Sequence, residues 1–148
     1  MILILQRCSE ANVSVSNSII GSINKGLVVF IGVEKDDNEK TVNQLVKKII
    51  NLRIFNDDND RMNKSIIDIK GSVLAISQFT LCGDLRKGRR PSFIKSAGPK
   101  LAKFLYECFI DGLINQGVPV ESGQFGAQMS IFLINEGPAT FYLNSSEL

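Results

Sequence analysis

The apolar run from Val73 to Leu81 is the feature that most constrains how this chain can fold. Its apolar and partly β-branched residues are typical of a buried strand. The run nevertheless ends in Ser77, Gln78 and Thr80, and polar side chains inside a core have to find hydrogen-bonding partners. The sequence therefore predicts a core strand that carries polar chemistry at its end.

A Gly-Pro step near the other end of the chain is the second constraint. Gly137-Pro138 lies within the segment Asn135 to Thr140, between two apolar runs. Proline lacks an amide donor and restricts the residue before it, so this step should interrupt strand pairing. It is either an ordinary turn or a backbone feature that the rest of the fold holds in place.

The other apolar runs predict a sheet of short strands. Leu27 to Val33 is apolar on both faces, so it should be a central strand. Ile2 to Arg7 and Ala11 to Val15 should form one interrupted strand, with a bulge at Ser9-Glu10. Further short strands are predicted over residues 19–23, 52–55, 118–120, 127–134 and 139–143.

Two amphipathic stripes predict two helices that cover the sheet. Asp36 to Glu39 offers an N-cap and a capping-box glutamate for the first helix, and its stripe is Val42, Leu45, Val46, Ile49 and Ile50. Gly98-Pro99 should open the second helix and Gly117 should end it. The second stripe, which makes Cys108 a core thiol, is Leu101, Phe104, Leu105, Cys108, Phe109 and Leu113.

These elements together predict an α+β fold. We expect mostly antiparallel sheets that curl around a core, with the two main helices packed on one side. A chain of 148 residues can bury ~70% of its unfolded surface, so one domain over residues 1–148 needs no disulfide or metal to hold it.

The absence of histidine narrows the chemistry that is open to this chain. Ser-His-Asp and Cys-His nucleophile systems are excluded, as are histidine-ligated zinc sites. We expect no metal and no cofactor. A catalyst would have to use backbone dipoles, hydroxyls, carboxylates or groups of its own substrate.

The sequence also bears on where the protein works. No apolar run approaches the ~18 residues of a membrane span, and residues 1–5 lack the basic start and long apolar core of a signal peptide. Three cysteines at wide spacings, without a CxxC pair, fit reduced thiols better than a disulfide framework. We therefore expect a cytoplasmic protein with no membrane partner.

Two groups of positive charge leave alternatives open. Arg86, Lys87, Arg89 and Arg90 form a run without an acid, which is either a solvated face or a loop that contacts phosphates. Arg7 closes an otherwise apolar strand, either as a snorkelling strand-end residue or as a brace for another loop.

Two motifs carry a resemblance to a known family. Ser77-Gln78-Phe79-Thr80 and the hexapeptide Asn135-Glu136-Gly137-Pro138-Ala139-Thr140 resemble the two signature motifs of the D-aminoacyl-tRNA deacylases, also called D-tyrosyl-tRNA deacylases. They stand in the expected order and separation, in a chain of matching length. The similarity covers nearly the whole chain, including residues 6–7, 32–33, 36–37, 51–55, 86–93 and 123–126.

The resemblance implies a homodimeric hydrolase that cleaves the ester joining a D-amino acid to the 3′ end of tRNA. It implies a barrel-like deacylase fold in which a cis Gly137-Pro138 peptide enters the partner's active site and filters chirality. The resemblance also implies roles for individual residues. The active site would hold Ser77, Gln78, Phe79 and Thr80, and the substrate would be bound by Asn135, Gly137 and Pro138. Phe125 and Met129 would contact the terminal adenosine, and Arg7 would brace the Gly-Pro loop.

Ester hydrolysis needs a nucleophile and donors for the developing oxyanion. The backbone amides of Phe79 and Thr80 are natural donors, and we favour attack by water, assisted by the ribose 2′-hydroxyl of the substrate. Thr80 itself is the alternative nucleophile, although no histidine is present to deprotonate it. A filter that reads the α-carbon cannot separate glycyl from D-aminoacyl esters, so we expect broad D specificity and cleavage of glycine misattached to alanine tRNA.

The alternative to an enzyme is a non-catalytic RNA-binding module. In that case residues 86–90 would bind phosphates, and the polar residues at the end of the predicted strand would have a structural role alone. The sequence lacks the interleaved aromatic residues of a single-strand stacking platform, which counts against this alternative. A metal-dependent hydrolase is a third reading, and the absence of histidine and of a carboxylate cluster disfavours it.

Overall fold

Strand β1 (Ile2–Val15) is the element on which the sheet is assembled in the computed structural model, which describes residues 1–148. It pairs antiparallel with β2 (Ser18–Ile23), with β3 (Gly26–Gly32) and, along nearly its whole length, with β8 (Ser130–Asn144). The two predicted pieces of β1 are thus one strand, and its pairing with β8 is irregular on both sides of Cys8.

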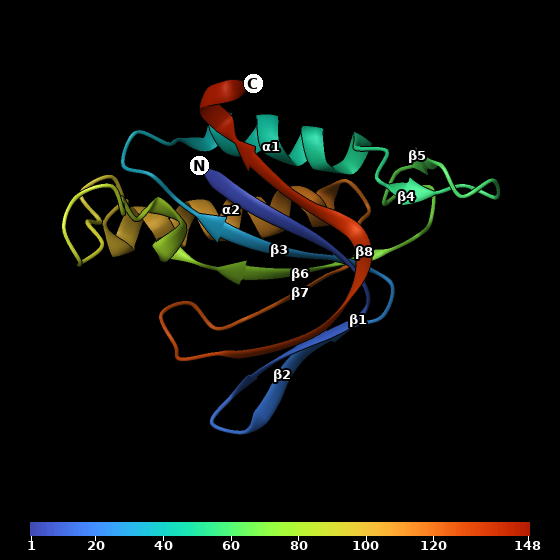
Figure 1. Cartoon of the computed structure of the whole chain (residues 1–148), viewed down its shortest axis with the longest axis horizontal. Helices are drawn as coiled ribbons and strands as arrows, with labels where there is room; N and C mark the ends of the chain where they lie inside the picture. Colours follow the sequence, from blue (N-terminus) through green and yellow to red (C-terminus); the bar gives the residue numbers. More distant parts are fainter.

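The sheet continues from β3 through two parallel pairings. β6 (Ser72–Ser77) lies beside β3, and β7 (Val120–Ser122) lies beside β6. The order is β2-β1-β3-β6-β7 with β8 on β1, and Figure 1 shows how these strands curl into a nearly closed barrel. A separate hairpin pairs β4 (Phe55–Asn56) with β5 (Met62–Lys64).

Two helices, α1 (Glu39–Asn51) and α2 (Pro99–Asn115), cover one face of the sheet (Figure 1). The predicted α+β fold, with its barrel-like sheet and two helices on one side, is confirmed. None of the helices has both the length and the apolarity that crossing a bilayer requires.

Helix α1 buries the predicted apolar stripe and takes its N-cap from the predicted segment, but the capping-box residue is not the predicted Glu39. Asn38 is the N-cap, and its side chain accepts hydrogen bonds from the amides of Lys40 and Thr41. Thr41 therefore occupies the third helical position and completes the capping box, whereas Glu39 stands at the first position, too early to do so.

Helix α2 begins at Pro99 as predicted, and Gly117 follows its end with φ of 81°. Its buried face is rotated from the predicted one: Phe104 is exposed and Cys108 is only half-buried. Tyr106 takes the buried position instead, because its hydroxyl donates a 2.8 Å hydrogen bond to the carbonyl oxygen of Ala75 in β6.

The predicted strand from Val73 to Leu81 is shorter in the structure. Ser77 is its last residue, and the amide of Gln78 donates to the carbonyl oxygen of Ile31 over 2.7 Å. Residues Phe79–Cys82 then form a 3₁₀ helix, η1, because β3 also ends here and offers no further pairing partner. The polar residues therefore lie at a strand-to-helix turn.

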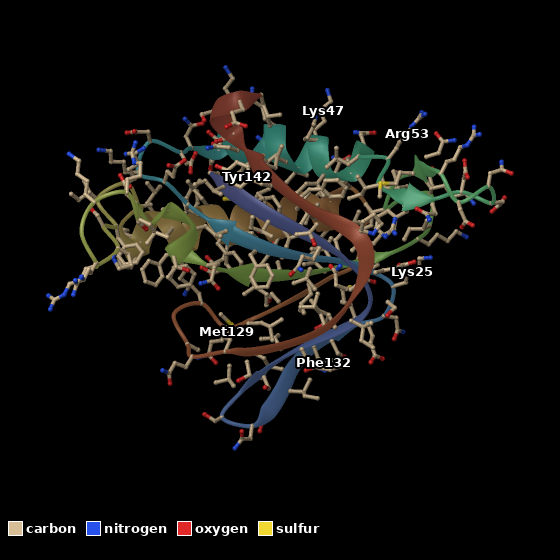
Figure 2. The ribbon with its side chains drawn as sticks, viewed as in Figure 1. Lys25, Lys47, Arg53, Met129, Phe132 and Tyr142 are labelled. Carbon is tan, nitrogen blue, oxygen red and sulfur yellow. The ribbon has the colours of Figure 1, made fainter.

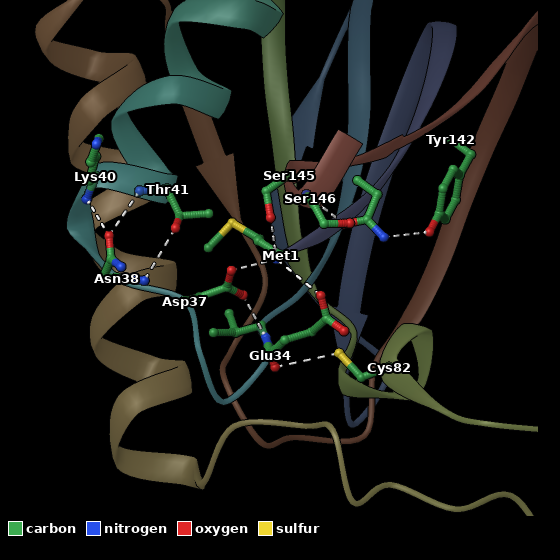
Figure 3. Close-up of polar contacts among 12 residues, drawn as sticks. Met1, Glu34, Asp37, Asn38, Lys40, Thr41, Cys82, Tyr142, Ser145 and Ser146 are labelled. Atoms are coloured by element: carbon green, nitrogen blue, oxygen red, sulfur yellow. Dashed lines mark hydrogen bonds and ion pairs between the residues drawn. The ribbon is translucent and has the colours of Figure 1, made fainter. Parts of the chain in front are cut away.

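The amino-terminal ammonium group of Met1 connects three segments that are distant in sequence (Figure 3). It donates to Asp37 Oδ1 at 2.5 Å and to Ser145 Oγ at 2.7 Å, with Glu34 Oε2 at 3.3 Å. Ser145 belongs to the short 3₁₀ helix η2 (Ser145–Glu147). These bonds fix the first residue of the chain, directly before β1, against the loop before α1.

Candidate active site

A cavity of about 670 Å³ opens where the parallel strands β3 and β6 end. Ligands of parallel sheets commonly bind beyond the carboxyl ends of the strands. Ser77, Gln78 and Phe79 line the cavity from the end of β6, and Phe125 and Met129 line it from the segment that joins β7 to β8. The structure thus brings together five of the residues that sequence analysis singled out.

None of the 15 residues that line this cavity is ionisable. Most are apolar, and the polar side chains among them are Ser77, Gln78 and Ser96. A reaction in this cavity has to rely on backbone groups, neutral side chains, water or the substrate.

The turn after β6 supplies both a side-chain hydrogen bond and open backbone donors. Gln78 Nε2 donates to Thr80 Oγ1, so the two side chains fix one another. Phe79 and Thr80 are the first residues of η1, and the first amides of a helix have no acceptor within that helix. Thr80 itself is exposed beside the cavity and does not line it.

Tyr106 and Gly123 hold the wall that carries Phe125 and Met129. The carbonyl oxygen of Ala75 accepts from the Tyr106 hydroxyl at 2.8 Å and from the Gly123 amide at 3.0 Å. The Tyr106 ring lies 6.0 Å from that of Phe125, and burial raises the pKa of Tyr106 to about 12. Gly123 leaves room for Met129 (labelled in Figure 2), because a Cβ at Gly123 would overlap with the Met129 sulfur.

The Gly-Pro step interrupts the pairing of β8 with β1 as predicted, but it forms a bulge within one strand where two separate strands were expected. Gln6 pairs with Thr140 and Cys8 pairs with Asn135, so residues 136–139 all stand opposite the single residue Arg7. The Gly137-Pro138 peptide is cis, and both of its residues are exposed, whereas Ala139 is buried. Asn135 accepts hydrogen bonds from Gln6 Nε2 at 3.4 Å and Thr140 Oγ1 at 3.3 Å, which closes the neck of the bulge.

Arg7 is buried, with 2% of its surface exposed, and holds this bulge from inside. Its Nε donates to the carbonyl oxygen of Glu136 and its Nη2 to that of Gly137, both over 3.1 Å. On the other side its Nη1 donates to the carbonyl oxygen of Ile54 at 2.8 Å and to Asn56 Oδ1 at 2.9 Å. It is therefore a fixed brace rather than a snorkelling residue.

Asn56 is a member of this site that sequence analysis missed. It lies in β4, more than forty positions from Arg7, inside a turn-like run of asparagines and aspartates. Nothing in that run distinguishes one residue from the next. Only the pairing of Phe55 and Asn56 with β5 places its side chain against the guanidinium group.

Within one chain, the bulge lies level with the start of β6 and the cavity lies at the end of β6, and Figure 1 shows the course of this strand. Arg7 pairs with Leu27, and Leu27 lies beside Val73 at the start of β6. Ser77 is four residues further along β6, about 13 Å away at the usual strand rise. Asn135, Gly137 and Pro138 accordingly do not line the cavity.

The basic run forms a loop that projects from the body of the protein, with nitrogen-bearing side chains at its tip (Figure 2). Its base is closed by paired backbone hydrogen bonds between Asp84 and Ser92, at 2.8 and 3.0 Å. Arg86 Nε and Nη2 bind the Asp84 carboxylate at 2.9 and 2.6 Å, which holds the pKa of Asp84 far below its usual range. Lys87, Arg89 and Arg90 are exposed and form no ion pair.

Comparisons with known proteins agree over almost the full length. The family model described as D-Tyr-tRNA(Tyr) deacylase matches residues 4–144. The D-aminoacyl-tRNA deacylase of Bacillus pumilus is 50% identical over 147 residues, which are 99% of this chain and 100% of that protein. That of Clostridioides difficile is 51% identical over 144 residues, 97% of each chain. The resemblance of the two sequence motifs is thereby confirmed.

Solved structures share the fold. A c-Myc DNA unwinding element binding protein superposes with a TM-score of 0.92 at 33% identity, over 97% of this chain and 98% of its own. A probable eukaryotic D-amino acid tRNA deacylase superposes with a TM-score of 0.81 over 96% of this chain and 98% of its own. At 19% identity the second match shows a common fold alone.

Proposed function

Because this chain belongs to the D-Tyr-tRNA(Tyr) deacylase family, we propose that it hydrolyses the ester between a D-amino acid and the 3′ end of tRNA. The products are the free amino acid and tRNA with a free terminal ribose. The observation that carries this proposal is the cavity at the end of β6, which has an apolar lining without an ionisable side chain and lies beside the first amides of η1.

The backbone amides of Phe79 and Thr80 serve as the oxyanion donors in this proposal. The ester carbonyl oxygen, placed at the first turn of η1, accepts their hydrogen bonds as negative charge develops on it, and one such donor is typically worth ~3 kcal/mol. Gln78 and Thr80 keep this turn in one conformation through their mutual hydrogen bond. Ser77 and Gln78 supply the polar part of the cavity wall.

Water is the nucleophile that we propose, with the substrate's ribose 2′-hydroxyl assisting its deprotonation. No lining side chain can act as a general base, which supports a role for the substrate itself. Water adds to the ester carbonyl carbon, and the bond from that carbon to the ribose 3′-oxygen then breaks. The leaving oxygen takes up a proton and becomes the 3′-hydroxyl of tRNA.

A second copy of the chain provides the chirality filter. The Gly137-Pro138 bulge lies too far along the sheet to reach the cavity of its own chain, which supports its presentation by a partner. The outer face of β8 exposes Phe132 and Tyr142 (labelled in Figure 2) together with Ile134, and no strand pairs with its outer edge. These features support a homodimer in which each bulge enters the partner's cavity.

The filter acts by filling space. A rigid backbone beside the α-carbon excludes an L side chain but makes few contacts with a D side chain. The enzyme therefore accepts D-amino acids with many different side chains. Glycine has no Cβ and passes the same filter, which gives cleavage of glycine misattached to alanine tRNA as well. The phosphates of the tRNA lie along the exposed Lys87, Arg89 and Arg90.

The decisive test compares release of amino acid from D-tyrosyl-tRNA and L-tyrosyl-tRNA by the purified protein, with a chelator present. Selective release of D-tyrosine supports the editing reaction. Equal release from both esters would contradict the filter while leaving the hydrolysis in place. Binding of tRNA without release from either ester would favour the non-catalytic RNA-binding module.

A further inference from the structure

Two exposed phenylalanines meet at the mouth of the cavity. The ring centroids of Phe79 and Phe93 are 5.0 Å apart and the rings are tilted by 57°. Phe79 is 54% exposed and Phe93 is 36% exposed, and both line the cavity. An aromatic pair that its own chain leaves uncovered is an available surface for another flat apolar group.

The ring of Phe93 is held in place by its surroundings. A Cβ at Gly83 would approach Phe93 Cε1 to 3.0 Å, so the ring lies directly against the backbone of that glycine. The backbone bonds between Asp84 and Ser92 fix the residue before Phe93, and its own carbonyl oxygen accepts from the Ser96 amide at 2.9 Å. Phe93 is therefore a preorganised surface.

The basic loop ends at this aromatic pair. Phe93 follows directly after Ser92, which closes the loop that carries Lys87, Arg89 and Arg90. Cations for phosphates beside aromatic rings for bases are the combination with which proteins bind single-stranded nucleic acid. The sequence showed no interleaved aromatics because Phe79 and Phe93 are fourteen positions apart, and only the loop closure brings them together.

We propose that Phe79 and Phe93 form a stacking subsite for the unpaired nucleotide that precedes the terminal adenosine of the substrate. Its base lies on the Phe93 ring, and the phosphates on either side of it lie within reach of Lys87, Arg89 and Arg90. This inference rests on the proposed function. It gives the side chain of Phe93 a role in reading single-stranded RNA, separate from the backbone chemistry at Phe79 and Thr80.

The test compares two substrates that differ only in the nucleotides before the adenosine. D-tyrosyl-adenosine lacks them, whereas a CCA trinucleotide carrying D-tyrosine at its 3′ end has them. Wild-type protein should cleave the trinucleotide ester with the higher kcat/KM. The Phe93→Leu variant should lose about tenfold in kcat/KM on the trinucleotide ester, mainly through KM, and keep its rate on D-tyrosyl-adenosine.

Controls separate stacking from a structural role. Phe93→Tyr keeps a flat ring and should retain the preference for the trinucleotide, and Phe104→Leu removes an exposed aromatic from α2 and should change neither rate. An equal loss on both esters, or no loss on either, would overturn the subsite. If wild-type protein cleaves neither ester, the proposed function fails rather than the subsite alone.

A second variant keeps the inference testable if Phe93→Leu does not fold. Replacing Lys87, Arg89 and Arg90 with glutamine removes exposed charges from a loop whose closure by Asp84 and Arg86 is unaffected. The slope of log KM against log salt for the trinucleotide ester should fall, by up to about one for each phosphate that a cation no longer neutralises. An unchanged slope would contradict the placement of the phosphates.

Discussion

Arg7 donates a hydrogen bond from Nη2 to the carbonyl oxygen of Gly137, 3.1 Å away, from the one position in β1 that faces the four-residue bulge of β8. The same guanidinium group is anchored behind by Ile54 and Asn56. The position of the Gly-Pro bulge is therefore set by a buried side chain whose own position is set by a different hairpin.

Arg7→Lys should weaken both stability and chiral selection. Lysine has three donors on a single nitrogen in place of the planar fork with which Arg7 bonds four acceptors, so at least one of these acceptors loses its partner. We expect a loss of ~3 kcal/mol in the free energy of unfolding and a smaller ratio of D- to L-tyrosyl-tRNA cleavage. Urea denaturation measures the free energy of unfolding, and the rates of D- and L-tyrosyl-tRNA cleavage give the ratio. As a control, Arg53→Lys at an exposed arginine should change neither the free energy of unfolding nor the cleavage ratio. An unaltered cleavage ratio in Arg7→Lys would count against the role of Arg7 in positioning the bulge.

Asn56→Leu should act only through Arg7. The substitution removes one acceptor of Nη1, which keeps its bond to Ile54, so the expected loss in the free energy of unfolding is ~1 kcal/mol. In a double-mutant cycle the Asn56→Leu change should cost less in the Arg7→Lys background than in wild type. Strict additivity of the two losses would show that the residues act independently.

Thr80→Ala should leave most of the activity. The Thr80 hydroxyl accepts from Gln78, and no ionisable group lines the cavity to deprotonate it. We expect a fall in kcat of less than about tenfold, since only the order of the turn is disturbed. A loss on the order of 10⁴, or an acyl ester trapped on Thr80 and seen by mass spectrometry, would make it the nucleophile instead.

Gly123→Ala should displace Met129 from the cavity wall. The added Cβ would overlap with the Met129 sulfur and lie 3.3 Å from Ile76 Cδ1, and the flexible thioether is the group that can move. We expect KM for the tRNA ester to rise severalfold with little change in kcat. The double variant with Met129→Ala, which removes the clash, should show no further rise in KM; an additional rise would indicate a different cause.

Alkaline pH should destabilise the fold through two buried thiols. Burial raises the pKa of both Cys8 and Cys82 from 9.0 to about 11. Between these values the unfolded chain releases protons that the folded chain keeps, so the free energy of unfolding falls as the pH rises above 9. Urea midpoints from about pH 8 to about pH 11 should show this decline, and the Cys8→Ala/Cys82→Ala variant should show a shallower one. An identical slope would assign the decline to other groups.

The buried face of one helix could be predicted from the sequence, whereas that of the other could not. Val42, Leu45 and Ile49 repeat at helical spacing on a helix that contacts the core along one stripe, so the burial of α1 could be predicted. Helix α2 is apolar around more of its surface, so the spacing of apolar residues alone did not indicate whether Phe104 or Tyr106 is buried. The hydroxyl partner of Tyr106 belongs to β6, which local periodicity cannot reveal.

In the candidate site, too, some residues could be identified from the sequence and others could not. Ser77, Gln78 and the Gly137-Pro138 step stand out in the sequence because they place polar or restricted residues at the ends of apolar runs. Asn56 and Phe93 do not, since each acts only through a residue brought near by the fold. An aromatic residue three positions after the last arginine of the basic run was the one local signal that could have drawn attention to Phe93.

The separation of the bulge and the cavity along one sheet has a genetic consequence. In the proposed dimer, a chain with a damaged bulge loses chiral selection and a chain with a damaged cavity loses hydrolysis, yet in a mixed dimer the intact bulge of one meets the intact cavity of the other. Two such alleles should complement each other, and random pairing of equal amounts would restore about a quarter of the wild-type sites. Under the proposed function, a cell that carries two such defective copies of this gene would still edit its tRNA.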